Sequence, residues 1–180
     1  MCPYYSMWYE VLRRSLSNRY KRENPSYEGV SVCSEWLHLS GFKNWVLSEL
    51  KGQPLYDRDG CRLEVDKDLS YTGEGSKIYS PETCILLPRT VNRFLIQAKY
   101  NDSLPVGISI TSRGKRLNIP AYVCRIRNPL TGKERSTSFS SEEEAKDYWV
   151  KEKIKICKDL CDYYHLPDEV YRMMMSKVLR

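Results

Sequence analysis

Three short segments with alternating apolar and polar residues are followed by one long amphipathic segment in the C-terminal half of this chain. The alternating segments are residues 107–111, 122–127 and 134–139. Alternation with period two is typical of strands that bury one face, so we expect a three-stranded antiparallel sheet. Ser141 and Glu144 form a capping-box pair that begins a long helix, whose apolar stripe would cover one face of the sheet. Pro167 ends that helix, and a last helix runs toward Leu179.

The N-terminal half combines helix and strand patterns in a different order. Apolar residues at three- and four-residue spacing predict a helix over residues 5–20, and a second helix over 40–50 with Ser40 as its N-cap. Two strands and a helix then follow, over residues 62–66, 84–87 and 90–99, with a long loop between the strands. We therefore predict an α+β fold in two units, residues 1–99 and 103–180.

Composition excludes several classes of protein. Hydrophobic residues make up 41% of the 180 residues, which is enough to bury a core, so we expect a globular chain. No apolar run approaches the roughly 18 residues of a membrane span, and the N-terminus lacks a signal-peptide pattern. The seven cysteines are odd in number and include no pair at zinc-knuckle spacing, and with no secretion signal we expect reduced thiols in a cytosol. Cys157 and Cys161 are four residues apart on one face of a predicted helix, where we expect small core side chains. A zinc site built from distant cysteines stays open but has no support.

Positive charge is concentrated in the middle of the chain. Residues 89–135 carry 10 basic and 2 acidic side chains, whereas residues 1–88 carry 11 and 12, and residues 136–180 carry 8 and 9. A segment with this imbalance favours a polyanionic partner such as nucleic acid. The alternative is a solvated basic surface with no ligand.

Polar side chains follow the first predicted strand of the N-terminal half and recur on the next helix. Asp66, Lys67 and Asp68 stand at the strand end, and Asn92 lies one turn into the helix. A carboxylate and an amide oxygen that converge there are ligands suited to a hydrated magnesium ion, which can hold a phosphodiester and stabilise its leaving oxygen. The alternative is a polar strand end with Asn92 as a capping side chain.

These residues resemble the phage HNH endonucleases, which have the ββα-metal (His-Me finger) fold. The resemblance extends from about Tyr5 to Lys99. It depends mainly on two motifs, Val65-Asp66-Lys67-Asp68 and Tyr79-Ser80-Pro81-Glu82-Thr83-Cys84, which are followed by Asn92. It implies a metal-dependent hydrolase of double-stranded DNA, of phage or homing-endonuclease type, in a bacterial host cytosol. It also implies Mg²⁺ or Mn²⁺ as cofactor, Asp66 and Asn92 as metal ligands, and a catalytic group of Asp66, Lys67 and Asp68.

The sequence departs from that family at the general base. The family has a histidine where this chain has Lys67, and an ammonium accepts a proton only if its pKa falls several units from about 10.4. Several readings stay open: Lys67 with a lowered pKa is the base, Asp68 or His38 does that work, or the site is inactive. Lys67 would otherwise act as a cation beside the phosphate.

Residues 104–163 resemble the plant-type APETALA DNA-binding domain, a three-stranded sheet packed on one helix. The match includes Leu104-Pro105-Val106-Gly107, Glu143-Glu144-Ala145 and Tyr148, and it departs at Thr137, where the family has glycine. A sheet that presents arginines can enter the major groove and contact guanine. The predicted DNA contacts are Arg113, Lys115, Arg116, Arg125, Arg127, Lys133 and Arg135. If Cys124 and Ile126 pack on the helix, Arg125 and Arg127 face outward.

A basic cluster near the N-terminus, including Arg13 and Arg14, is predicted to touch phosphates without reading sequence. Two other functions stay open: a sequence-specific DNA-binding protein that no longer cleaves, and a phage factor that binds a host protein. Double-strand cutting by a single site needs a homodimer or two successive events, and the sequence does not choose between them.

Overall fold

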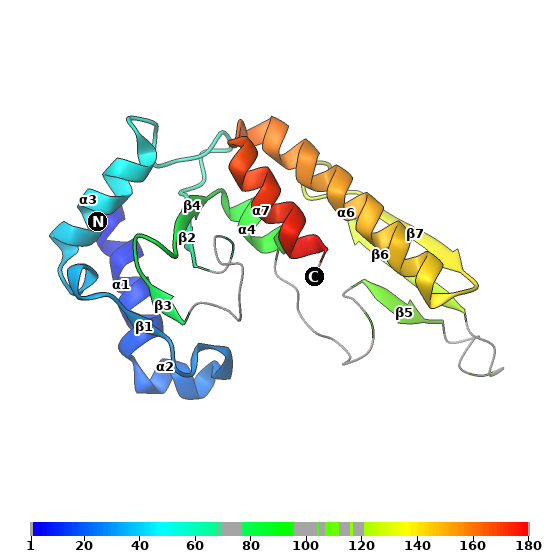
Figure 1. Cartoon of the computed structure of the whole chain (residues 1–180), viewed down its shortest axis with the longest axis horizontal. Helices are drawn as coiled ribbons and strands as arrows, with labels where there is room; N and C mark the ends of the chain where they lie inside the picture. Colours follow the sequence, from blue (N-terminus) through cyan, green and yellow to red (C-terminus); the bar gives the residue numbers. More distant parts are fainter. Residues whose placement is uncertain are drawn as a thin grey trace. The chain divides into compact units, whose positions relative to one another are not determined.

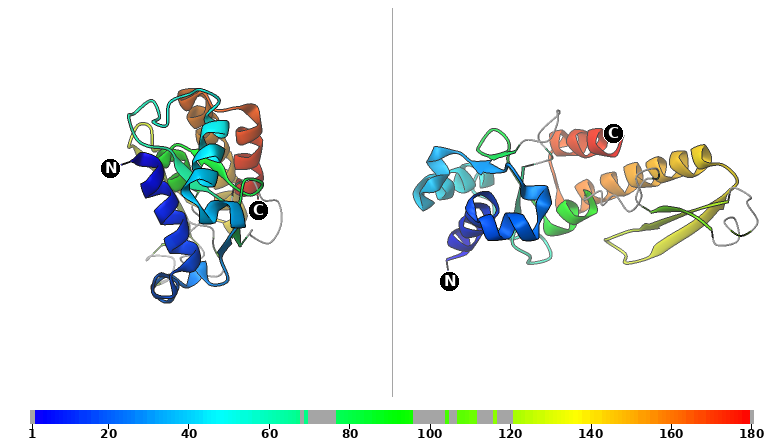
Figure 2. Two further views of the ribbon diagram at one scale, coloured as in Figure 1. Left: turned by 90° about the vertical axis from the view of Figure 1, so that its left-hand side faces the viewer. Right: turned by 90° about the horizontal axis from the view of Figure 1, so that it is seen from below.

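The computed structural model describes residues 2–67, 69, 77–95, 104, 107–111, 116 and 121–179. The chain divides into two compact units, residues 1–92 and 93–180, each with its own helices and sheet strands (Figures 1 and 2). The predicted α+β fold class is confirmed. Within the described ranges, no helix is both long and apolar enough to cross a membrane.

The N-terminal unit begins with a helix that ends earlier than predicted. Ser17 is extended (φ −80°, ψ 110°), and its side chain accepts a hydrogen bond from the Tyr20 backbone N–H at 3.2 Å, which starts a new helix. The prediction of one helix over 5–20 is therefore wrong. The helices of this region are α1 (Pro3–Leu16), α2 (Asn18–Glu23), η1 (Pro25–Tyr27), η2 (Ser34–Leu37) and α3 (Leu39–Leu50).

Helix α3 begins one residue before the predicted cap. Its N-cap is His38, so Ser40 lies in the first turn, and the prediction of Ser40 as the cap is wrong. A Cβ atom on Gly41 would collide with the backbone carbonyl of Glu35, so this glycine lets the start of α3 approach η2 closely. That approach brings the aromatic residues of η2 and α3 into one cluster.

Two small two-stranded sheets complete the unit, and the helix after them begins in this unit and ends in the next one. β1 (Ser31–Val32) pairs in parallel with β3 (Ile78–Tyr79), and β2 (Glu64–Asp66) pairs antiparallel with β4 (Ile85–Leu87). Helix α4 (Arg89–Leu95) follows β4 directly, so the predicted order of strand, loop, strand and helix is present. The rest of the predicted helix, residues 96–99, lies outside the described residues.

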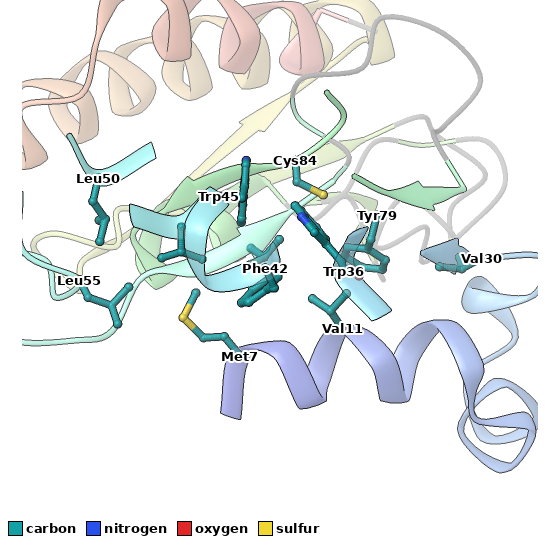
Figure 3. Close-up of a cluster of buried hydrophobic side chains, with 12 residues drawn as sticks. Met7, Val11, Val30, Trp36, Phe42, Trp45, Leu50, Leu55, Tyr79 and Cys84 are labelled. Carbon is teal, nitrogen blue, oxygen red and sulfur yellow. The ribbon is translucent and has the colours of Figure 1, made fainter. Parts of the chain in front are cut away.

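The core of this unit lies between α1 and α3 (Figure 3). Trp36 and Phe42 are completely buried, and their rings meet edge-on with centroids 5.1 Å apart. The ring centroids of Trp45 and Trp36 are 4.5 Å apart, and Met7 and Val11 of α1 pack against this cluster. Full burial of large aromatic side chains is a main source of stability for a unit of this size.

The C-terminal unit is a three-stranded antiparallel sheet beside a long helix (Figure 2, right). Its elements are β5 (Ile108–Ile110), β6 (Tyr122–Arg127), β7 (Glu134–Phe139), α6 (Glu142–Tyr164) and α7 (Asp168–Val178). The strands pair antiparallel in the order β5-β6-β7, so the predicted three-stranded antiparallel sheet is confirmed. The Ser141 side chain caps α6 by accepting a hydrogen bond from the Glu144 N–H at 3.1 Å, which confirms Ser141 as the cap. The Glu144 carboxylate, the other half of the predicted capping box, accepts from the Ser140 hydroxyl at 3.1 Å.

The register of the sheet decides which side chains meet α6. Cys124 and Ile126 of β6 are buried, and so are Trp149 and Ile156 of α6. Phe139 of β7 packs on Tyr148 of α6 with ring centroids 5.2 Å apart. One face of the sheet is therefore covered by the helix, as the sequence predicts.

Candidate functional site

Asp66 occupies the strand-end position predicted for a metal ligand. It is the last residue of β2, lies opposite Ile85 of β4, and is 9% exposed. Its Oδ1 accepts a hydrogen bond from the Leu69 backbone N–H at 2.7 Å. Burial of a carboxylate is costly unless hydrogen bonds or cations offset it, and this amide provides one such bond.

Asn92, the second predicted metal ligand, contacts a carboxylate that was not among the predicted site residues. Its Nδ2 donates to Glu64 Oε2 at 2.9 Å, and Glu64 Oε1 lies 3.3 Å from Arg89 Nε. Glu64 begins β2 two residues before Asp66, so the two carboxylates share a face of the strand. Glu64 was not among the predicted site residues, although counting back by two from Asp66 would have identified it.

The other predicted catalytic residues are placed only in part. Lys67 follows β2 and is half-buried, whereas Asp68 lies outside the described residues. His38, the alternative base, is exposed and lines a surface groove. The other residues of that groove are Glu35, Ser40, Gly41, Asn44, Trp45, Ser48 and Pro81. None of the residues that line that groove belongs to the predicted catalytic group or metal ligands.

The described residues do not form a cage of protein ligands. Among them, no cluster of three or more His, Cys, Asp or Glu side chains is arranged to hold a metal ion. All seven cysteines are free, and Cys157 and Cys161 are buried, as predicted. Burial raises the pKa of both Cys84 and Cys157 to about 12, which disfavours the thiolates that zinc requires.

The sheet face opposite α6 presents two arginines. Arg125 and Arg127 are exposed, and their cross-strand neighbours on β7, Ser136 and Glu134, are exposed as well. Ser138 is the next exposed residue of β7 on this face, and we call these five residues the arginine face. Among the described residues, no ion pair includes either arginine.

Arg135 lies on the other side of the sheet. Its register partner is Ile126, which faces α6, and its Nη1 lies 3.2 Å from Glu152 Oε2 of that helix. Lys133 is exposed in the turn between β6 and β7, and Arg116 is exposed. The remaining predicted contacts, Arg113 and Lys115, lie outside the described residues.

The N-terminal arginines differ from each other. Arg13 is exposed, pairs with Glu10 at 2.7 Å and lies over the Tyr20 ring. Arg14 points inward instead: it hydrogen-bonds the Tyr79 side chain, and the pKa of that phenol is raised chiefly by burial. The side chain predicted to touch a phosphate, Arg14, is therefore engaged with Tyr79 inside the protein. Arg14 and Arg13 are adjacent on α1, so their side chains point to different sides of the helix.

An aromatic groove on α1 and α2 is a further surface feature. It is lined by Tyr5, Trp8, Tyr9, Leu12 and Leu16, together with Tyr20 and polar residues. Tyr5, Tyr9 and Leu16 are 42%, 52% and 55% exposed, which is unusual for large apolar side chains gathered at one place. The two arginines of the groove, Arg13 and Arg19, are paired with glutamates.

Lys153 of α6 is a largely buried cation that the sequence reasoning did not select. Its Nζ donates to the Phe94 carbonyl at 3.0 Å and lies 3.8 Å from the centroid of the Phe94 ring. Burial lowers the pKa of Lys153 to about 8, while nearby Cys157 acts in the opposite direction. Its place between Trp149 and Cys157, at four-residue spacing on the apolar stripe, was the available signal.

Comparison with known proteins gave no relative. No protein-family model matches the chain, and neither a curated protein nor a solved structure matches it. The resemblances to the HNH endonucleases and to the APETALA domain therefore depend on the sequence motifs quoted above.

Proposed function

We propose that this chain binds double-stranded DNA through the arginine face and hydrolyses it at a metal-dependent site around Asp66. The observation that carries the proposal is the exposure of Arg125 and Arg127 on a sheet whose other face packs on α6. The major groove admits β-strands, and arginine bonds guanine through two parallel N–H donors. Small hydroxyl neighbours, Ser136 and Ser138, let a groove approach these arginines closely.

The donor chemistry around β2 supports a hard divalent cation. The carboxylate of Asp66 and the amide oxygen of Asn92 offer oxygen ligands, which suit Mg²⁺ or Mn²⁺ better than zinc, and Glu64 accepts a hydrogen bond from the Asn92 amide nitrogen. Mg²⁺ commonly keeps several water ligands and takes only one or two carboxylates, so a closed protein cage is not required. When bound, such an ion supplies Lewis acidity at the phosphodiester.

The first test is cleavage of supercoiled plasmid with added Mg²⁺ or Mn²⁺. We expect the wild type to cut, and Asp66→Ala and Asn92→Ala to lose at least a hundredfold in rate, as removal of a group that stabilises transition-state charge does. Glu82→Ala, which removes an exposed carboxylate of the same unit, is the matched control and should cut normally. Equal cutting by all variants would show that another residue set, or a contaminant, does the chemistry.

The second test is duplex binding measured by fluorescence anisotropy over a range of salt. Arg125→Ser combined with Arg127→Ser should reduce affinity and weaken the preference for duplexes with guanine at the site, because each bidentate arginine–guanine pair discriminates against the wrong base by about 1 to 3 kcal/mol. Arg172→Gln removes an exposed cation from α7 and serves as control. Unchanged affinity in the double variant would refute the arginine face as the DNA contact.

A binding-only protein is the second candidate, because Lys67 stands at the position of the general base. Intact plasmid in both metals, with salt-dependent duplex binding retained, would select it. A protein that binds a host factor is the third candidate, supported by the aromatic groove. Absence of any duplex binding at low salt would select that function over both DNA functions.

A further inference from the structure

A pocket of about 270 Å³ lies between α6 and the turn that joins β6 to β7. Ile126 and Ile156, both buried, contribute apolar lining. The charged side chains that line it are Lys133, Arg135, Lys155, Glu152 and Asp159. All of them belong to the C-terminal unit, and the pocket is roomy enough for a phosphate group with its first waters.

The charges around this pocket leave a positive excess. Arg135 and Glu152 form an ion pair at 3.2 Å and neutralise each other. Lys133 and Lys155 take part in no ion pair within the described part of the chain. Asp159, one turn after Lys155 on α6, offsets one of the two ammonium groups, so the pocket keeps a net charge of about +1. Its chemistry therefore favours an anion.

The backbone of the turn is already occupied by internal hydrogen bonds. The Asn128 side-chain oxygen accepts from the Leu130 N–H at 2.9 Å and the Thr131 N–H at 3.3 Å, and the Asn128 carbonyl accepts from the Gly132 N–H at 2.9 Å. An anion here would thus be held by the lysine side chains. Lysine binds phosphate as a flexible point charge, which suits contacts to a backbone without base reading.

The arginine face reaches the same turn from the opposite side of the hairpin. Arg127 Nη2 lies 3.9 Å from the position that a Cβ atom would take on Gly132. Cations therefore stand on both sides of the turn: Arg127 on the arginine face, and Lys133 with Lys155 at the pocket. A duplex that contacts Arg127 carries phosphates past this end of the hairpin.

We propose that the pocket binds a backbone phosphate of the duplex that the arginine face contacts, through Lys133 and Lys155. The inference depends on the proposed DNA binding and adds a phosphate contact on the helix side of the sheet. It assigns Lys155 of α6, a residue outside the basic central segment, to the DNA interface.

The experiment compares two double variants of the full chain by anisotropy with a labelled duplex between 50 and 200 mM salt. Lys133→Gln with Lys155→Gln removes the pocket cations, and Lys151→Gln with Lys158→Gln removes two exposed cations of the same helix as the matched control. We expect the slope of log K against log salt to fall by about 1 to 2 in the pocket variant only. Across this salt range, the wild type should then lose about tenfold more affinity than the pocket variant.

Several outcomes would overturn the inference. An unchanged slope in the pocket variant, or equal changes in the two double variants, would show that the pocket does not contact DNA. Calorimetric titration of the free protein with inorganic phosphate tests the other source of the anion. Phosphate binding that depends on Lys133 and Lys155, with no effect on duplex binding, would replace the duplex with a free anion as ligand.

The failure of this inference can be distinguished from the failure of the proposed function. If the Arg125 and Arg127 double variant loses duplex binding while the pocket variant binds normally, the proposed DNA binding through the arginine face stands and the pocket inference alone is refuted. A wild type that binds no duplex at low salt refutes both together.

Discussion

Lys153→Met should change how the stability of the C-terminal unit depends on pH. In an unfolded chain lysine loses its proton near pH 10.4, whereas burial lowers the pKa of Lys153 to about 8 in the folded protein. Between these pH values the unfolded state holds a proton that the folded state lacks, so raising the pH favours folding. Relative to the methionine variant, the wild type should therefore gain stability from about pH 8 to 10.5.

The size of this gain follows from the pKa difference. One pKa unit corresponds to about 1.4 kcal/mol, so the full difference would give roughly 3 kcal/mol. The Phe94 carbonyl at 3.0 Å and the Phe94 ring at 3.8 Å favour the ammonium, and the side chain keeps some solvent contact. We therefore expect a gain of about 1 to 2 kcal/mol.

The assay is urea unfolding followed by circular dichroism at several pH values between 7 and 10.5. Burial raises the pKa of Cys157 to about 12, and such thiols lower stability as the pH rises, but this contribution is present in both proteins and largely cancels in their difference. Lys151→Met, at an exposed position of the same helix, is the control. Parallel stability curves for wild type and Lys153→Met, or an NMR titration that places Lys153 near 10.4, would refute the reasoning.

Two further substitutions test the packing. Gly107→Ala should destabilise the protein by about 2 kcal/mol or more, because φ is +92° and the new Cβ would lie 2.5 Å from the Arg125 carbonyl oxygen. Gly60→Ala is the control: its φ is +73°, but the new Cβ would meet no atom within 4 Å, so it should cost only about 1 kcal/mol in the same urea titration. Arg14→Met should cost about 1 to 3 kcal/mol because Tyr79 loses its partner, whereas Arg13→Gln at the exposed pair should change thermal unfolding little. Equal effects within either pair would contradict the geometry.

The C-terminal unit was predictable because its signals are local and repeated. Strands β6 and β7 are each six residues long, so their alternation extends over several periods. Ser141 marks the start of α6 with a cap that depends only on the next three residues. The side of Arg135 was also readable: counting back by two from Phe139 places it on the helix face.

The N-terminal unit was harder because its decisive contacts are short or distant. Strands β1 and β3 have two residues each, too few to show alternation, and they join Ser31 to Ile78 across the sequence. The break at Ser17 depends on one side chain that competes for the Tyr20 amide, and helical spacing does not report such competition.

The contact between Asn92 and Glu64 bears on how the candidate site is built. A side-chain amide donates through its nitrogen and accepts through its oxygen, and the bond to Glu64 uses only the nitrogen. A metal ion requires the oxygen, so Glu64 does not compete for ligation and instead fixes the orientation of the amide, as hydrogen-bonded partners of metal ligands commonly do. Arg89 Nε, 3.3 Å from Glu64 Oε1, helps hold that carboxylate in place. In the proposed site, a cleaving enzyme would differ from a binding-only protein in the proton acceptor beside Asp66, a position at which this chain has Lys67.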